Sequence, residues 1–273
     1  MDKTLGVLMP VYSGDTKEAF QDAWESIYIH QTRKADEYVI VKDGPVDNDL
    51  LNYIKYLEQL PIVKVVSIEK NVGLPNALNA GLDVMKASWV IRADSDDINI
   101  PIRIDRIYNG LENKYVLYTS PVLEFIDDPN VITSIRGCKD RFGFLLTNPI
   151  NHASSVFSRS AAIDVGKYRD FKFFEDIDLW IRLTGNSGKI KCDEKPLVKF
   201  RMNEQAFRRR MGLVYLKHEY KFLVNCYSEG YITIIQLIIR IIIGFFVRNL
   251  SSRLYQWLIS NLLRKRYVES VRR

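Results

Sequence analysis

Short runs of apolar residues alternate with longer amphipathic stretches over the first hundred positions of the chain. The runs are strand-length, rich in Val and Ile, and bounded by turn residues, which is the pattern of buried β-strands. They cover residues 5–11, 38–42, 63–68 and 89–93. Helix-length stretches lie between them, at residues 17–31, 48–59 and 74–86. Strands that alternate with helices predict an α/β fold with a mostly parallel, Rossmann-like sheet and helices on both of its faces.

The middle of the chain, from about residue 115 to 200, has a more mixed pattern. Residues 115–125 and 154–158 look like strands, 176–184 have the apolar spacing of a helix, and 196–201 are expected to form an edge strand. Ligands of open α/β sheets bind beyond the carboxyl ends of the strands. The polar residues at those ends are therefore the first candidates for chemistry.

The pattern changes again after about residue 211. Residues 211–227 are helix-like, 231–247 are almost entirely apolar, and 252–273 are amphipathic and basic. We therefore predict a catalytic domain over residues 1–212 and a C-terminal segment of amphipathic helices over residues 213–273.

The apolar stretch 231–247 is short for a membrane-spanning helix, which needs about 20 mostly apolar residues. It also contains Gln236 and Arg240, and a central arginine is costly inside a bilayer. Basic residues follow it, and they favour a helix that lies in the interface of an anionic leaflet. The pattern favours an anionic membrane surface as a partner, while a buried core or dimer helix and a true span stay open.

Charge is spread unevenly along the 273 residues. Residues 201–273 hold 14 Lys and Arg against four Asp and Glu, whereas the whole chain has a net charge of +6, so residues 1–200 are slightly acidic. A basic end on an acidic body indicates contact with something anionic. Because these basic residues alternate with Leu, Ile and Trp, lipid is favoured and no nucleic-acid partner is expected.

The cysteines and the N-terminal residues indicate the cellular compartment of the protein. Cys138, Cys192 and Cys226 are far apart, odd in number and in no metal-ligand spacing, which predicts buried or idle thiols in a reducing compartment. The chain enters a strand-like stretch directly after Thr4, and this predicts no signal peptide. We expect a cytoplasmic protein, peripheral to the inner face of the cell membrane.

A cluster of acidic residues, Asp94, Asp96 and Asp97, directly follows the strand that ends near Arg92. Crowded carboxylates repel each other unless a cation lies between them. Mg²⁺ and Mn²⁺ prefer carboxylate oxygens and often share them with substrate phosphates. An acidic turn without function is the alternative for an isolated motif of this kind, but the position after a buried strand favours a metal site.

A second acidic pair, Glu175 and Asp176, begins a predicted helix. Acidic residues in a first helical turn are common caps and dipole partners, so a structural role explains them as well as a functional one. The functional interpretation is a general base, because a sugar hydroxyl that attacks must lose its proton.

Three further features are candidates for binding. Gly73 and Pro75 begin a helix whose N-terminus is a natural neighbour of phosphate, although a structural role would explain both. Arg201 and the run 208–210 suit a diphosphate, or simply a solvated basic face. His152 is one of three histidines, and a structural role is favoured for it.

Together these segments resemble the family-2 glycosyltransferases with the GT-A fold, over about residues 4–212. Each motif is weak alone, but five occur in the family's order at plausible strand or helix ends. The matching segments are Pro10-Val11-Tyr12, Asp43-Gly44, Asn71-Val72-Gly73-Leu74, Asp94-Ser95-Asp96-Asp97 and Glu175-Asp176.

The resemblance implies roles for these residues. Asp96 would contact Mn²⁺ or Mg²⁺ directly, Asp94 would reach the donor ribose or the metal, and Asp43 would hold a uracil-like base. Asp176, paired with Glu175, would deprotonate the acceptor. The implied donor contacts are Pro10, Val11, Tyr12, Asp43, Asn71, Gly73, Arg92, Asp94, Ser95, Arg208 and Arg209.

The resemblance also implies an activity: inverting, metal-dependent transfer of a hexose from a UDP-sugar donor. The chain lacks the Gln-x-x-Arg-Trp motif of processive synthases, which indicates one sugar per encounter. The acceptor expected from similar bacterial enzymes is a polyprenyl-diphosphate-linked glycan in O-antigen, capsule or exopolysaccharide assembly.

Two alternatives remain at this point. A phosphoryl- or nucleotidyl-transferring enzyme on a similar sheet would usually carry a glycine-rich phosphate loop, and the sequence has none. A pseudoenzyme that binds a nucleotide sugar without turnover is disfavoured by the presence of Asp94, Asp96 and Asp176.

Overall fold

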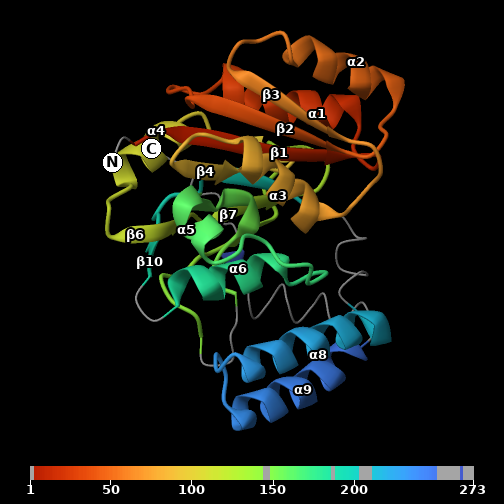
Figure 1. Ribbon diagram of the computed structural model, residues 1–273, viewed down its shortest axis with the longest axis vertical. Helices are drawn as coiled ribbons and strands as arrows, with labels where there is room; N and C mark the ends of the chain where they lie inside the picture. The colour runs from red at the N-terminus through yellow and green to blue at the C-terminus, as the bar shows by residue number, and fades with distance from the viewer. Residues whose placement is uncertain (1–2, 144–147, 186–187, 203–210, 251–264, 267–273) are drawn as a thin grey trace.

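A seven-stranded sheet forms the centre of the protein in this computed structural model, which describes residues 3–143, 148–185, 188–202, 211–250 and 265–266. Its strands are β1 (Leu5–Tyr12), β2 (Glu37–Asp43), β3 (Val63–Ile68), β4 (Trp89–Arg92), β6 (Tyr115–Thr119), β9 (Val156–Ser158) and β10 (Lys189–Cys192). They lie in the order β10-β6-β9-β4-β1-β2-β3, and all of them except β9 are labelled in Figure 1. Only β9 runs antiparallel to its neighbours. The predicted mostly parallel sheet is confirmed.

Helices cover both faces of this sheet. One face carries α1 (Lys17–Trp24) with the π-helical turn η1 (Glu25–Ile29), α2 (Asn48–Leu57) and α4 (Arg103–Gly110). The other carries α3 (Leu74–Val84), α5 (Arg159–Asp164) and α6 (Glu175–Thr184). Side chains alternate along a strand, so Val7 and Met9 pack with the first group while Leu8 packs against α3. A side chain at Gly81 of α3 would collide with Leu8, so glycine allows this helix to lie close to β1.

The protein has a second, smaller sheet. Its strands are β5 (Ile98–Asn99), β7 (Val122–Phe125), β8 (Ser134–Arg136), β11 (Val198–Arg201) and β12 (Lys265–Arg266), in the order β12-β8-β7-β11-β5. The single strand predicted over 115–125 is therefore two strands in different sheets. The chain changes sheets at Ser120-Pro121, where the Ser120 carbonyl accepts hydrogen bonds from Asn151 and Ser154. The predicted edge strand 196–201 is also wrong in position, because β11 lies between β7 and β5.

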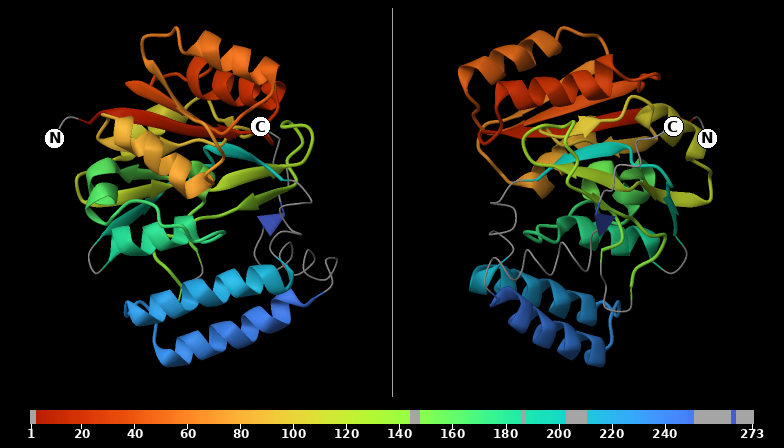
Figure 2. Two further views of the ribbon diagram at one scale, coloured as in Figure 1. Left: turned by 45° about the vertical axis from the view of Figure 1, so that its right-hand side comes forward. Right: turned by 180° about the vertical axis from the view of Figure 1, so that it is seen from behind.

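Two antiparallel helices, α8 (Gly212–Ser228) and α9 (Ile234–Arg248), follow. We call them the C-terminal hairpin; a short 3₁₀ turn, η2 (His152–Ser154), completes the described elements. The hairpin packs on α6, away from α1 and α2 (Figure 2). The C-terminal helices are confirmed, but the division at residue 212 stays a prediction, and most of 252–273 lies outside the described residues. No helix in the described ranges is long and apolar enough to cross a membrane.

The prediction of idle thiols is wrong for two of the three cysteines. Cys138 and Cys192 form a disulfide, with their Cα atoms 6.1 Å apart. Cys226 of α8 is a free thiol buried in the core between the hairpin and α6, and burial raises its pKa to about 12. The pair is 54 residues apart in sequence, and sequence spacing alone does not reveal such a partner.

A buried ion pair in α6 holds this helix against the loop that follows α5. Both Asp178 and Arg182 are almost fully buried, and the Arg182 Nε and Nη2 donate to one Asp178 oxygen at 2.9 and 2.6 Å. Arg182 also donates to the carbonyls of Val165 and Lys167. The helix that begins with Glu175 is thereby tied to the loop after α5.

We expect Asp178→Asn to lower the free energy of unfolding by about 3–5 kcal/mol, because it leaves a buried arginine without its counter-charge. Urea unfolding followed by circular dichroism measures the loss. The matched control is Asp83→Asn, since Asp83 is exposed and pairs with Lys167 at the surface; its effect should stay below about 1 kcal/mol. Equal effects for the two variants would contradict the argument.

Candidate functional site

Arg92, the last residue of β4, lies at the centre of the polar residues at the strand ends. Its side chain is 1% exposed, and its guanidinium donates to the Ala93 carbonyl and to the Asp94 carboxylate. Arg103 of α4, also buried, donates to the backbone carbonyls of Arg92 and Ala153. A buried arginine is tolerated only when it is paired. The buried charge of Arg92 therefore requires the carboxylates that follow it in the sequence.

The three carboxylates of the 94–97 turn have different environments. Asp94 pairs with Arg92 and keeps 27% of its side chain exposed. Asp97 is buried and accepts the Arg201 backbone N–H at 2.8 Å. This hydrogen bond joins the turn to β11. Burial, followed by the charges of Asp94 and Asp96, raises the pKa of Asp97 well above its usual value, so the three carboxylates lie close together as the sequence predicted.

Asp96 remains close to other negative charges. Its pKa is raised to about 6, first by burial and then by Asp94 and Asp15, while Arg201 opposes the shift. The backbone of Asp96 accepts a hydrogen bond from the Arg201 Nε at 3.1 Å. Asp94 and Asp96 therefore form an electrostatically strained pair at the end of β4.

Asp15 is a member of this acidic group that the sequence motifs did not indicate. It accepts the Tyr12 N–H at 2.8 Å, and it interacts with Ser95, which is itself buried. Burial raises the pKa of Asp15, and the charge of Asp94 adds to the shift. The sequence did offer one signal for Asp15, because it lies in the turn after β1, whose end carries the motif Pro10-Val11-Tyr12.

The fit to a divalent cation rests on these charges. In the ranges that the structure describes, no three His, Cys, Asp or Glu side chains are arranged to hold a metal ion. Mg²⁺ and Mn²⁺, however, are commonly held by one or two carboxylates together with water and substrate phosphates. Asp94 and Asp96, whose negative charges repel each other, fit that pattern.

The ends of β1 and β2 bring Tyr12 beside Asp43, in register across the two strands. Pro10 and Val11 are buried within the sheet, whereas Tyr12 is 43% exposed. Of the three residues predicted for this loop, only Tyr12 presents a large side chain at the surface.

Asp43 has structural partners that the sequence did not predict. Its two carboxylate oxygens accept the N–H groups of Val72 and Gly73 at 2.8 and 3.1 Å, and Asn71 donates to its carbonyl. Gly44 has φ of +85°, and a Cβ there would lie 2.7 Å from the Asn71 nitrogen. The turn after β2 and the start of α3 thus form one rigid unit, while the contact between Asp43 and a base stays a prediction.

Glu175 and Asp176 lie at the first turn of α6. Asn148 donates to Asp176 Oδ2 at 2.9 Å, and the Ile177 N–H donates to Oδ1 at 2.7 Å. Burial, reinforced by the charge of Asp176, raises the pKa of Glu175 to about 7, while Arg92 opposes the shift. Arg92 therefore acts on both acidic motifs, although they are some eighty positions apart in sequence.

A residue two positions before Glu175 is held in an unfavourable conformation. Phe173 has φ of +73°, a region that bulky side chains rarely adopt. Its ring packs on Tyr215 and His218 of α8, at centroid distances of 5.0 and 5.7 Å. Backbone strain of this kind persists only where surrounding packing enforces it, so the hairpin helps to set the direction of α6.

The pKa of Glu175 gives a prediction for stability. The folded value of about 7 exceeds the usual 4.5, so this group supports the fold below pH 4.5 and loses that support as the pH rises through 7. We expect the free energy of unfolding of wild type, relative to Glu175→Gln, to fall over this window. Urea titrations across the window measure it, with Glu58→Gln, an exposed position, as control. A constant difference between wild type and Glu175→Gln is the contrary outcome.

His152 lies in a cluster of aromatic residues between the two acidic motifs. Its Nε2 is 3.2 Å from the Tyr168 hydroxyl, and its ring packs edge-on against Trp180. Burial and the charge of Arg92 lower the pKa of His152 to about 4, against the opposing charges of Asp176 and Asp94. The imidazole is neutral at pH 7, and its structural role stays a prediction.

The sequence profile of glycosyl transferase family 2 matches residues 6–163. The chain belongs to glycosyl transferase family 2. UDP-Gal:alpha-D-GlcNAc-diphosphoundecaprenol beta-1,3-galactosyltransferase of Escherichia coli is 31% identical to it over 265 residues, covering 95% of this chain and 96% of that protein. Amylovoran biosynthesis glycosyltransferase AmsE of Erwinia amylovora is 32% identical over 83% of this chain and 88% of that protein.

Two solved structures show the fold of this glycosyltransferase to be GT-A. Staphylococcus aureus TarS in complex with UDP-GlcNAc superposes with a TM-score of 0.62 at 15% identity, covering 95% of this chain and 71% of that one. Mannosyltransferase PcManGT from Pyrobaculum calidifontis, in complex with GDP-Man and Mn²⁺, gives a TM-score of 0.62 at 14% identity, covering 92% and 71%.

The predicted site residues of the glycosyltransferase thus fall into two groups, and the charge of Arg92 acts on carboxylates beside both of them. One comprises the ends of β1, β2 and β4, and the other the first turn of α6. The predicted donor contacts Arg208 and Arg209 lie outside the described residues. Asn148, which contacts Asp176, was missed because nothing local in its sequence marks it.

Proposed function

We infer that this glycosyltransferase moves a single hexose from a UDP-sugar to a hydroxyl group of a saccharide carried on a polyprenyl diphosphate, with inversion at the anomeric carbon and dependence on Mn²⁺ or Mg²⁺. The observation that carries the inference is the match to the E. coli galactosyltransferase, which extends over 95% of this chain. The pathway that fits is the assembly of a bacterial polysaccharide such as O-antigen, capsule or exopolysaccharide. The relative AmsE is likewise named for a biosynthetic pathway, that of amylovoran.

The donor would lie across the ends of β1, β2 and β4. Tyr12 and Asp43 would contact the nucleoside, with Asn71 and Gly73 fixing the loop beside them. Asp94 and Asp96 would hold the cation, which when bound neutralises charge on the departing nucleoside diphosphate. Two carboxylates that repel each other without a ligand support this assignment, because a cation relieves their repulsion.

The acceptor would lie against the first turn of α6. The raised pKa of Glu175 keeps a proton on that carboxyl group below about pH 7, so the pair presents the Asp176 carboxylate as its proton acceptor. Asn148 orients that carboxylate. The acceptor oxygen gives its proton to Asp176 and bonds to the anomeric carbon, the bond to the UDP oxygen breaks on the opposite face, and the configuration inverts.

The test is a donor screen with the purified full chain, Mn²⁺ and a lipid-linked GlcNAc diphosphate, with released nucleoside diphosphate and product measured. UDP-Gal is the first donor to try and UDP-Glc the second. NMR of the product gives the anomeric configuration, and retention would refute inversion. Saturable binding of the UDP-sugar without any turnover would instead support a pseudoenzyme.

The C-terminal hairpin supports a position at the membrane surface. Large apolar side chains lie exposed along α9, namely Ile234, Ile235, Ile238, Ile242, Ile243, Phe245 and Phe246. A contiguous apolar surface of this kind marks a contact with lipid or protein, and the basic C-terminal residues favour anionic lipid.

We expect the double variant Ile235→Glu/Phe246→Glu to lose at least about tenfold in affinity for phosphatidylglycerol vesicles, since each side chain is worth about 1.5–3 kcal/mol when buried. Vesicle flotation measures this. The control is Ile126→Glu/Val131→Glu, which alters two equally exposed apolar residues near β7 and β8. Loss of flotation in both variants, or in neither, would count against the hairpin as the contact surface.

A further inference from the structure

The disulfide between Cys138 and Cys192 joins a loop to the edge of the main sheet. Cys192 ends β10, which pairs with β6 at that edge. The next residue, Asp193, is buried, and its carboxylate accepts a hydrogen bond from Arg106 at 2.6 Å. Cys138 instead lies in the loop after β8, and we call residues 138–143 the disulfide loop. The sheet thus holds one cysteine firmly, and the bond ties the disulfide loop to it.

One end of the disulfide loop supports the segment that contacts the proposed base. The Lys139 N–H donates to the Pro149 carbonyl at 3.0 Å. Asn148, the residue before Pro149, donates to Asp176 Oδ2 at 2.9 Å. The disulfide is formed by the residue before Lys139, and it therefore fixes the backbone that positions Asn148.

The other end of the disulfide loop reaches the same turn of α6 through apolar contacts. Phe142 packs against the core that contains Phe174 and Ile177. These two core residues flank the Glu175-Asp176 pair in the sequence. Both ends of the disulfide loop therefore support the first turn of α6, where the proposed base lies.

A reductant can reach the disulfide. Both cysteines are only partly buried, and they line a cavity of about 630 Å³ that is open to solvent, between the disulfide loop and β10. The rate of thiol–disulfide exchange depends on access to the sulfur atoms, and accessible disulfides are the labile, regulatory ones. By its position, this bond belongs to the class that thiols can open.

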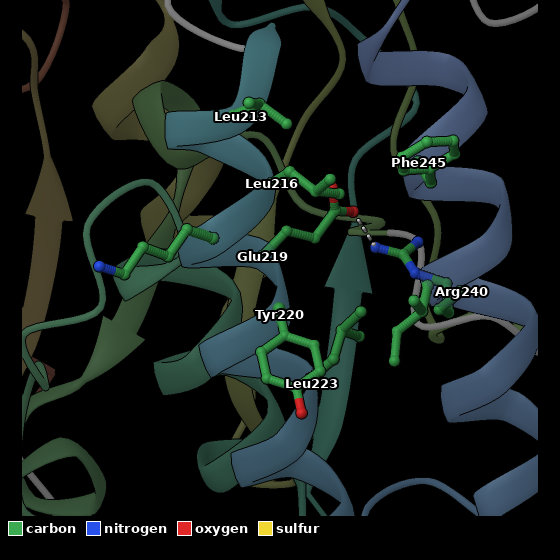
Figure 3. A pocket seen from close by; sticks show the side chains of 9 residues that line it. Leu213, Leu216, Glu219, Tyr220, Leu223, Arg240 and Phe245 are labelled. Atoms are coloured by element: carbon green, nitrogen blue, oxygen red, sulfur yellow. Dashed lines mark hydrogen bonds and ion pairs between the residues drawn. The ribbon is translucent and has the colours of Figure 1, made fainter.

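The third cysteine takes no part in this chemistry. Cys226 is 2% exposed, and burial raises its pKa to about 12, so it stays a protonated and unreactive thiol. It lies in the core between the hairpin and α6, and the hairpin is held together by the ion pair of Glu219 with Arg240 at 3.0 Å (Figure 3). A response of the protein to thiols therefore reports on the Cys138–Cys192 pair.

We propose that Cys138 and Cys192 form a thiol–disulfide switch that controls how well Asn148 positions the Asp176 carboxylate. The proposal rests on the proposed function, because it takes Asp176 as the base. In the oxidised state, the disulfide loop is tied to β10 and supports the first turn of α6. In the reduced state, the loop is released from β10 and transfer slows. Asn148 is a positioning residue in this scheme, since it acts through Asp176.

Opening the switch requires a dithiol as the reductant. One of its thiolates attacks a sulfur of the disulfide and forms a mixed disulfide, and its second thiolate then displaces the remaining protein sulfur. The dithiol is oxidised to a disulfide, while the two electrons and two protons that it gives up reduce both cysteines to thiols. The disulfide loop then gains conformational freedom, which weakens the contacts at both of its ends.

The first test compares the oxidised and the reduced wild-type chain. Dithiothreitol opens the bond, and mass spectrometry after alkylation gives the state of the cysteines. We expect kcat to fall about tenfold on reduction, which is the lower end of what a hydrogen bond to a charged group contributes, and to return on reoxidation. The KM for the UDP-sugar should not change, because the donor residues lie at the strand ends. An unchanged kcat would overturn the proposal.

The control for the reagent is the double variant Cys138→Ser/Cys192→Ser. It should have the lower kcat of the reduced chain, with and without dithiothreitol. A further loss on adding dithiothreitol would show that the reagent acts elsewhere, for example on the cation, and would count against the switch. If this variant does not fold, recovery of kcat on reoxidation of the wild-type chain decides the same question.

The second test asks whether the disulfide acts through Asn148. Asn148→Ala, at an exposed position, should lower kcat of the oxidised chain about tenfold, by the same hydrogen-bond reasoning. Reduction should then lower it little further, because two changes that remove one contact are not additive. Fully additive losses would refute this route.

Hydrogen exchange provides a readout that requires no turnover. Reduction should speed exchange of the Lys139 and Ile150 amides, which donate to the Pro149 carbonyl and to Asn148 Oδ1, while the amides of α2 serve as the internal control. Faster exchange at these two amides without transfer from any UDP-sugar removes the proposed function and leaves a redox-controlled loop. Transfer with the same kcat and the same exchange in both states removes the switch and leaves the proposed function.

Discussion

Replacing Asp176 by Asn is expected to lower kcat for hexosyl transfer by about 10²–10⁴, the range that a general base contributes. The amide is isosteric and still offers an oxygen to Asn148, so the first turn of α6 should keep its structure. The donor residues lie at the strand ends instead, and the KM for the UDP-sugar should therefore change little. Steady-state kinetics at saturating acceptor separate the two constants.

Two further variants sharpen this experiment. Glu175→Gln imitates the protonated carboxyl group that Glu175 carries below about pH 7, so at pH 6 it should keep kcat within a few-fold of wild type. Asp170→Asn alters an exposed carboxylate shortly before α6 and should have no effect. If Glu175→Gln loses as much as Asp176→Asn, the base is wrongly assigned within the pair. If neither loses activity, the acceptor does not lie at this turn.

The local pattern of apolar residues was sufficient to predict β1 to β4, whereas β10, at the edge of the main sheet, was not predicted. The strands β1 to β4 are covered by helices on both faces, so they read as continuous apolar runs, and the ends of those runs mark where ligands bind in such sheets. Arg92, Asp43 and Tyr12 were indicated in this way. Their order along the chain and the position of α6 then matched a known family.

The environments of individual carboxylates could not be predicted from the same pattern. Asp96 and Asp97 are neighbours in sequence, yet one lies with the candidate metal site and the other accepts a hydrogen bond from Arg201 of β11. The difference depends on a strand about a hundred residues away. The pairing of Cys138 with Cys192 and that of Glu219 with Arg240 were hidden for the same reason.

Arg240 shows how such a long-range partner changes an interpretation. From sequence, an arginine in the apolar stretch 231–247 only weighed against a membrane span. In the structure, it pairs with Glu219 inside the hairpin and leaves the exposed side of α9 apolar. The residue that counted against a membrane-spanning helix is therefore compatible with an interfacial one, since its charge is directed away from the apolar surface.

Replacing Asp96 by Asn is expected to abolish the stabilisation of the protein by Mn²⁺ and UDP while leaving the ligand-free protein as stable as wild type, or more so. Asp96 is buried beside Asp94 and Asp15, and removing one of three neighbouring negative charges relieves repulsion in the absence of a cation. The same removal deprives the cation of a ligand, which is worth several kcal/mol of charge stabilisation during transfer. Transfer should fall by at least about 10², by the same reasoning.

Thermal unfolding with and without Mn²⁺ and UDP separates this effect from misfolding, because a ligand raises Tm only if it binds the folded protein. A folding defect would lower the Tm of the ligand-free variant, whereas the loss of a cation ligand removes only the increase on adding Mn²⁺ and UDP. The matched control is Asp97→Asn, since Asp97 lies in the same turn but contacts the backbone of Arg201; it should keep the increase. If Asp96→Asn retains a full increase in Tm, the acidic turn does not hold the cation, and the repulsion between Asp94 and Asp96 needs another explanation.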